Sequence, residues 1–214
     1  MTVQLWCADG VFLAQVREDI VMLDVNADQY HCLLDAAEWM VVDTSGSVVV
    51  PDTAAANELL SAGIAVGERP GPPRRTSEAA QRELAPASSP SKWTLFHTGF
   101  ALATATMAFR DRTLRQIIET SAPSSARRGP VGDARLDRSV AAFRGALPWV
   151  PFEGECLQRA FQLRRVLAGK GIHTDWIFGV RTWPFAAHCW LQIGDLVIAD
   201  TLERVDRYTP IMVA

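Results

Sequence analysis

The chain has 214 residues, of which 49% are hydrophobic and 21% charged, with a formal net charge of −3 at pH 7. This length and composition can bury one medium-sized core or two small ones, which argues against wholesale disorder. The slightly acidic charge, with no continuous stripe of Arg or Lys, argues against nucleic acid as a partner.

Targeting signals are absent from the sequence pattern. The first ten residues, MTVQLWCADG, lack a basic start followed by an apolar run, so no secretory signal is predicted. The most apolar window, 93–109, is interrupted by polar residues and is shorter than the roughly 20 apolar residues of a membrane span. The four cysteines show no C-x-x-C spacing, so reduced thiols are expected. We therefore expect a cytoplasmic protein that does not contact a membrane.

Residues 1–66 predict a first domain of strands followed by helices. Three short apolar runs of strand length occur at 11–16 (VFLAQV), 19–25 (DIVMLDV) and 29–34 (QYHCLL), with a turn at 26–28. From Asp35 the apolar period lengthens, which predicts one helix to Met40 and another from 52 to about 62, with Asp52 as its N-cap.

Residues 67–91 have the composition of a linker. The segment GERPGPPRRTSEAAQRELAPASSPS is rich in Pro, Arg, Ala and Ser and poor in large apolar residues. It divides the chain into a domain at 1–66 and a second domain at 92–214.

The second domain predicts helices followed by strands, and hence an α+β fold. Helical patterns cover 93–118 and 133–144, and a third helix runs from Cys156 to Ala168 with its apolar side chains along one face. Gly169 and Gly171 stop this helix. Strand patterns follow in TDWIFGVRT, HCWLQI and LVIAD, the last two separated by a turn at 194–195.

Three residues of this second domain could form a nucleophilic site. A helix N-terminus favours a thiolate, and Cys156 lies where a helix begins. An imidazole could hold the thiolate and then protonate a leaving amine, while a carboxylate orients the imidazole. His188 and Asp200 lie on successive predicted strands and can supply both groups.

The geometry of the hairpin gives this hypothesis a test. In an antiparallel hairpin the residue numbers of directly opposite partners always add up to the same value. Because side chains alternate between the two faces, this sum must be even for His188 and Asp200 to lie on the same face. A two-residue turn at Gly194-Asp195 gives an odd sum and would place Asp200 opposite Cys189. The hypothesis therefore predicts an odd loop or a β-bulge near Gly194, and a regular two-residue turn would contradict it.

Metal binding is not predicted by the remaining His and Cys residues. Cys189 follows His188 directly and should point to the other face of its strand, as core filler, so the two form a poor chelate. His31 and Cys32 are an equally poor pair, and no further ligands occur at metal-site spacing. The sequence AGKG at 168–171 does not match a phosphate-binding loop. We expect no metal and no cofactor; ATP dependence is left open.

Three segments of the second domain resemble a known family. The stretches ECLQRAFQLRRVL, AAHCWLQI and VIAD resemble the transglutaminase-like leader peptidase of lasso-peptide biosynthesis, called the B protein. The resemblance implies a papain-like cysteine peptidase fold with Cys156 as nucleophile, His188 as base and then acid, and Asp200 as orienter. Papain-like enzymes have an oxyanion-binding Gln six residues before the nucleophile. Here that residue is Val150, which leaves the Cys156 backbone N–H as a candidate donor.

The first domain resembles a different element of the same kind of pathway. The stretch REDIVMLDVNADQYHCLL resembles the peptide-recognition element of ribosomal peptide maturation systems, which has a winged helix-turn-helix fold. The resemblance implies that a leader peptide binds between an edge strand, here containing Gln29, Tyr30 and His31, and the helix that contains Asn57 and Leu60. For Tyr30 and Leu60 a core position is an equal alternative.

Together these resemblances predict a cysteine endopeptidase that removes the leader of a lasso-peptide precursor, as a step of antibiotic biosynthesis. The expected partners are the precursor's leader and a separate asparagine-synthetase-like cyclase, which would close the macrolactam. Two alternatives stay open: a transglutaminase or other acyltransferase, whose acyl-enzyme is resolved by an amine, and a non-catalytic chaperone of the precursor.

Overall fold

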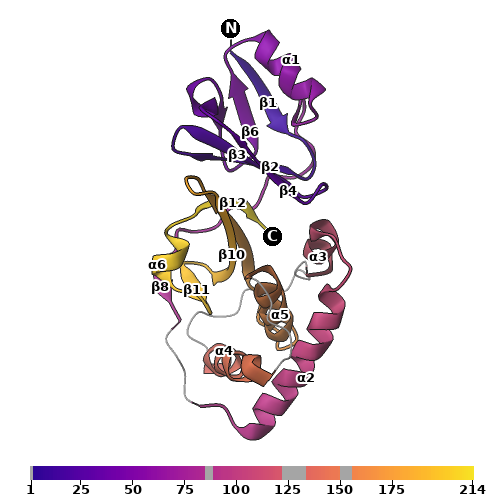
Figure 1. Cartoon of the computed structure of the whole chain (residues 1–214), viewed down its shortest axis with the longest axis vertical. Helices are drawn as coiled ribbons and strands as arrows, with labels where there is room; N and C mark the ends of the chain where they lie inside the picture. The colour runs from indigo at the N-terminus through magenta and orange to yellow at the C-terminus, as the bar shows by residue number, and fades with distance from the viewer. Residues whose placement is uncertain (1, 85–88, 122–133, 150–155) are drawn as a thin grey trace.

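The computed structural model describes residues 2–84, 89–121, 134–149 and 156–214. Figure 1 shows an N-terminal part built of short strands, above a C-terminal part in which helices lie beside a sheet. No helix among the described residues is long and apolar enough to cross a membrane.

The N-terminal part contains two small sheets and one α-helix. Its elements in chain order are β1 (Val3–Cys7), β2 (Val11–Val16), β3 (Asp19–Asp24), β4 (Gln29–Leu33), the 3-10 turn η1 (Ala36–Glu38), β5 (Val41–Val42), β6 (Ser47–Val50), α1 (Thr53–Ser61) and β7 (Ala65–Val66). The three predicted strands form one antiparallel sheet in the order β2-β3-β4, and a second sheet has the order β5-β6-β1-β7.

The predicted winged helix-turn-helix is not confirmed. Helix α1 forms with the predicted cap, because the Asp52 carboxylate accepts a hydrogen bond from the Ala55 N–H at 2.9 Å. The helix expected from Asp35 to Met40 is wrong: this segment forms only the η1 turn and leads into β5. A segment this short offers few helical hydrogen bonds to offset nucleation, whereas β5 and β6 gain partners in the sheet around β1.

In the C-terminal part, the longer helices pack on one face of a five-stranded sheet and a short helix packs on the other face. Its elements are β8 (Arg82–Glu83), α2 (Lys92–Phe109), α3 (Leu114–Ser121), α4 (Ala134–Ala146), the 3-10 turn η2 (Leu147–Trp149), α5 (Cys156–Ala168), β9 (Asp175–Arg181), β10 (Ala186–Ile193), β11 (Leu196–Ile198), α6 (Leu202–Val205) and β12 (Thr209–Val213). The strand order is β12-β9-β10-β11-β8. One strand, β8, comes from the segment predicted as a linker and pairs in parallel with β11.

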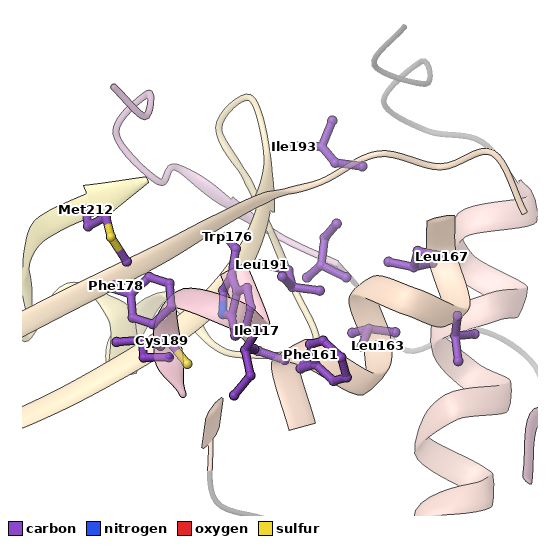
Figure 2. Packing of buried hydrophobic residues seen from close by; sticks show 14 of the residues in the cluster. Ile117, Phe161, Leu163, Leu167, Trp176, Phe178, Cys189, Leu191, Ile193 and Met212 are labelled. Carbon is purple, nitrogen blue, oxygen red and sulfur yellow. The ribbon is translucent and has the colours of Figure 1, made fainter. Parts of the chain in front are cut away.

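Helix α5 is the central element of this part. Phe161, Leu163 and Leu167 on its buried side pack against Trp176 and Leu191 of the sheet (Figure 2). Its other sides are covered by α2 and α4. The one buried amide of the helix is satisfied, because Gln162 donates to Thr106 Oγ1 of α2 at 2.8 Å. Burial on several sides fixes the position of the helix and therefore of Cys156 at its start.

The two parts share a hydrophobic core. Buried residues of β2 and β3, such as Val16 and Val21, belong to the same apolar cluster as the α5 and β9 side chains. At its edge, the Trp183 indole N–H donates to Asp19 Oδ2 at 2.9 Å, and the rings of Tyr30 and Phe185 lie 5.8 Å apart. The loop between β9 and β10 is thus held against β3 and β4.

Candidate active site

Cys156 is the first residue of α5 and is half-buried. The backbone N–H groups in the first turn of a helix have no partner within the helix, and their positive end favours an anion. The predicted start of this helix is confirmed at Cys156, with the chain ending the helix at Ala168 as the glycines predict. A thiol at this position is favourably placed to ionise.

The β10–β11 hairpin differs from the predicted geometry. Ile193 pairs with Leu196 across a regular two-residue turn, in which Gly194 adopts a φ of +56°. The predicted odd loop or bulge near Gly194 is therefore wrong. The ladder ends at Ile198, however, and Ala199 adopts a left-handed φ of +60°. This residue interrupts the regular alternation of side chains between the two faces of the sheet. Asp200, which a continued ladder would place opposite Cys189, therefore faces His188 instead.

His188 and Asp200 are in direct contact. His188 Nε2 and Asp200 Oδ2 are 2.6 Å apart, and the Thr201 backbone N–H donates to Asp200 Oδ1 at 2.9 Å. Arg204 lies 3.7 Å from the same oxygen. Burial opposes ionisation of Asp200, but the hydrogen bond with His188 and these neighbours outweigh it and hold the pKa of the carboxyl below its ordinary value.

Cys156 and His188 shift each other's pKa in opposite directions. Hydrogen bonds from the Cys189 thiol and from His188 stabilise the Cys156 thiolate against burial and lower its pKa to about 4. Burial disfavours the imidazolium of His188, but bonds with Asp200 and Cys156 outweigh burial and raise its pKa to about 9. Between these two values the pair is a thiolate and an imidazolium, the reactive state of a cysteine nucleophile. Because Nε2 faces Asp200, the nitrogen left for Cys156 is Nδ1.

Cys189 has a contact that the sequence did not predict. It is buried, as expected of core filler. Its thiol and its backbone N–H nevertheless contribute to lowering the pKa of the Cys156 thiol. The contact raises the pKa of the Cys189 thiol well above its ordinary value, with burial adding to the effect. Cys156 lies against the β10 backbone, so groups from neighbouring residues on both faces reach it.

Aromatic rings hold the imidazole in place. Trp190 stacks on His188 with ring centres 6.1 Å apart, and Tyr208 lies on it at 5.3 Å. Gly179 is directly opposite His188 in the β9–β10 ladder, and a Cβ there would lie 2.8 Å from Trp190 Cζ3. Sequence reasoning missed Tyr208 and Gly179. A glycine within an apolar strand is a signal of close approach, and could have indicated this position.

A cavity of about 520 Å³ opens beside these residues. Cys156, His188 and Asp200 all line it, together with Trp190 and Tyr208. The volume lies within the range of ligand pockets. Among the described residues no three His, Cys, Asp or Glu side chains are grouped as a metal site would require.

The residues predicted to bind a leader lie on two separate surfaces. Gln29 and His31 are exposed on β4, the outer strand of its sheet, and Tyr30 is half-buried beside Phe185. Asn57 and Leu60 are exposed on α1, which contacts β1, β6 and β7. Figure 1 shows α1 and β4 at opposite ends of the N-terminal part. Helix α1 packs on the second sheet, whereas β4 belongs to the first, so the two sets of predicted residues do not lie side by side.

Comparison with known proteins supports this architecture. A family model described as "Transglutaminase-like superfamily" matches residues 99–213, more than half of the chain. The chain belongs to the transglutaminase-like superfamily. The match includes Cys156, His188 and Asp200.

The transglutaminase-like chain also matches a curated protein. Over 60 residues it is 35% identical to "Microcin J25-processing protein McjB" of Escherichia coli. The matched stretch covers 28% of this chain and 29% of McjB, so less than a third of that relative is spanned. No solved structure matches. The match confirms the resemblance to the lasso-peptide B proteins.

Proposed function

We propose that this protein is a cysteine peptidase that binds the leader of a lasso-peptide precursor and cleaves it from the core peptide. The observation that carries the proposal is the 2.6 Å contact of His188 with Asp200 in a cavity that Cys156 also lines. The match to a protein named as processing microcin J25 supports the choice of a peptide substrate.

The reaction would proceed through a thioester. The Cys156 thiolate attacks the carbonyl carbon of the leader's last residue, and the Cys156 backbone N–H accommodates the oxyanion. The His188 imidazolium gives its proton to the leaving nitrogen, which frees the α-amine of the core peptide. The neutral imidazole then takes a proton from water, whose oxygen attacks the thioester and releases the leader as an acid.

The outer edge of β4 is the best-supported leader site. Among the described residues β4 pairs only with β3, and an unpaired strand edge can accept an extended peptide. Burial raises the pKa of the neighbouring Tyr30, and the negative charge of Cys156 adds to the effect. An extended leader on β4 would therefore lead toward the nucleophile. Holding both ends of one substrate raises its effective concentration at Cys156.

Acyl transfer to an amine is the second candidate, favoured by membership of the transglutaminase-like superfamily. The same thioester would then react with an amine instead of water. Under the leading proposal the core amine passes to a separate asparagine-synthetase-like cyclase. A chaperone without catalysis is the third alternative.

Product masses test the three alternatives. The substrate is a lasso-peptide precursor, to be sought among short reading frames near this protein's gene. It is incubated with the wild type, with Cys156→Ala and with Cys32→Ala. Cys32→Ala removes an exposed thiol but keeps the β4 backbone. We expect a free leader acid from the wild type and Cys32→Ala only. A leader joined to an added amine would indicate acyl transfer, and cleavage by Cys156→Ala would overturn the assignment of the nucleophile.

A further inference from the structure

The cavity beside Cys156 is lined by an excess of positive charge. Among the described lining residues, Arg144 of α4, Arg159 of α5, Arg204 of α6 and the His188 imidazolium stand against the Asp200 carboxylate and the Cys156 thiolate. The chain as a whole carries a formal charge of −3. Arginines from three separate elements thus converge on one pocket of an acidic protein, which concentrates positive potential where a substrate must enter.

Within the described ranges, two of these arginines form no ion pair with an acidic side chain. Asp200 is occupied by His188 and lies 3.7 Å from Arg204. Arg144 and Arg159 are exposed, and neither forms an ion pair with a side chain among the described residues. Arg159 follows Cys156 by three residues, which places it one helical turn away on the same side of α5.

A carboxylate is the group that this arrangement suits. A guanidinium stays charged and presents a planar pair of donors that matches both oxygens of a carboxylate. We infer that the cleft selects peptides that carry an Asp or Glu side chain close to the bond cleaved, with Arg159 and Arg144 as the specificity-determining residues. This inference rests on the proposed peptidase function and adds the chemistry of its substrate.

Two alkylating reagents test the charge of the cleft without any precursor. Iodoacetate carries a carboxylate, and iodoacetamide is its neutral analogue. The ratio of their second-order rates at Cys156, followed by peptide mass mapping, is measured for the wild type, Arg159→Gln, Arg144→Gln and Arg165→Gln. Arg165 lies on the same helix but does not line the cavity, so it is the matched control.

We expect the ratio to fall about threefold or more in Arg159→Gln and Arg144→Gln, because each loses one nearby charge that attracts the anionic reagent. Arg165→Gln should keep the wild-type ratio. Both reagents attack the same thiol of the same variant, so a general loss of thiol reactivity lowers both rates equally and leaves their ratio unchanged. An unchanged ratio in both cavity variants would overturn the inference.

Blocked peptides then separate a side-chain carboxylate from a terminal one. Three peptides of equal length are compared as protectants of Cys156 against iodoacetamide: an amide containing Asp, the same amide with Asn, and the Asn peptide with a free C-terminal carboxylate. The Asp amide should protect at about threefold lower concentration or better, and this advantage should vanish in Arg159→Gln. Equal protection by the two amides, or protection only by the free acid, would overturn the assignment to a side chain. Neither measurement requires cleavage, so failure of the peptidase proposal would be seen separately.

Discussion

Replacing Asp200 by Asn should lower the pKa of His188. In the wild type, burial opposes the imidazolium, yet the bonds with Asp200 and Cys156 raise the pKa to about 9, from an ordinary value of 6.5. Asn can still accept a hydrogen bond from Nε2–H but carries no charge. The imidazolium therefore loses its anionic partner at Nε2 and keeps only the thiolate of Cys156.

The expected size of this effect follows from the raised pKa. We expect the His188 pKa to fall by at least one pH unit, which corresponds to about 1.4 kcal/mol of lost imidazolium stabilisation. Because the raised pKa keeps His188 protonated up to about pH 9, lowering the pKa reduces the imidazolium fraction mainly at alkaline pH. At about pH 8.5 the protonated fraction would fall about threefold, and cleavage would fall with it because the leaving nitrogen needs that proton.

Nuclear magnetic resonance titration of the His188 ring measures the pKa directly, and the pH profile of cleavage provides a second readout. Glu203→Gln is the matched control, because Glu203 is an exposed carboxylate of α6 that pairs with Arg207. We expect this variant to titrate like the wild type. If His188 in Asp200→Asn still titrated near 9, Asp200 would not be the group that raises its pKa.

Three further variants test other parts of the site. Gly179→Ala should lower stability by about 1–3 kcal/mol and reduce the cleavage rate, because its methyl carbon would lie 2.8 Å from the Trp190 ring; thermal denaturation and kcat measure this, and wild-type values for both would contradict it. Cys189→Ala should raise the pKa of the Cys156 thiol above about 4 by removing a thiol donor, so iodoacetamide labelling of Cys156 should begin at higher pH. Cys189→Ser, which keeps a donor, should restore early labelling; identical onsets for both variants would refute the role of this donor. Trp183→Phe should lower stability in urea denaturation by about 1 kcal/mol through loss of its hydrogen bond to a buried carboxylate of β3, and an unchanged midpoint would show that this bond adds nothing.

The parts of the fold that local pattern determines could be predicted from the sequence. The apolar face and the glycine stop define α5, and the strand runs with their turn define β9, β10 and β11. Pairing between distant segments could not be predicted. Strand β8 contains only Arg82 and Glu83, and both are exposed, so no apolar period marks it. Strand β6 is a run of Ser and three valines that is typical of a strand, but its pairing with the distant β1 is not marked by any local pattern.

The same distinction separates the predictable from the unpredictable part of the site. Cys156, His188 and Asp200 could be proposed because a helix start and two strands supply them. Their meeting depends on Ala199, which no pattern marks. Its φ of +60° is unfavourable by about 1–2 kcal/mol for a residue with a side chain, and glycine would be the default choice there. A regular ladder through Ala199 would turn the carboxylate away from His188. The left-handed conformation of Ala199 therefore brings Asp200 to the imidazole, at this cost in free energy. Unfavourable backbone conformations of this kind persist where the surrounding packing enforces them, and here the bond between Asp200 and His188 is one of the contacts that does so.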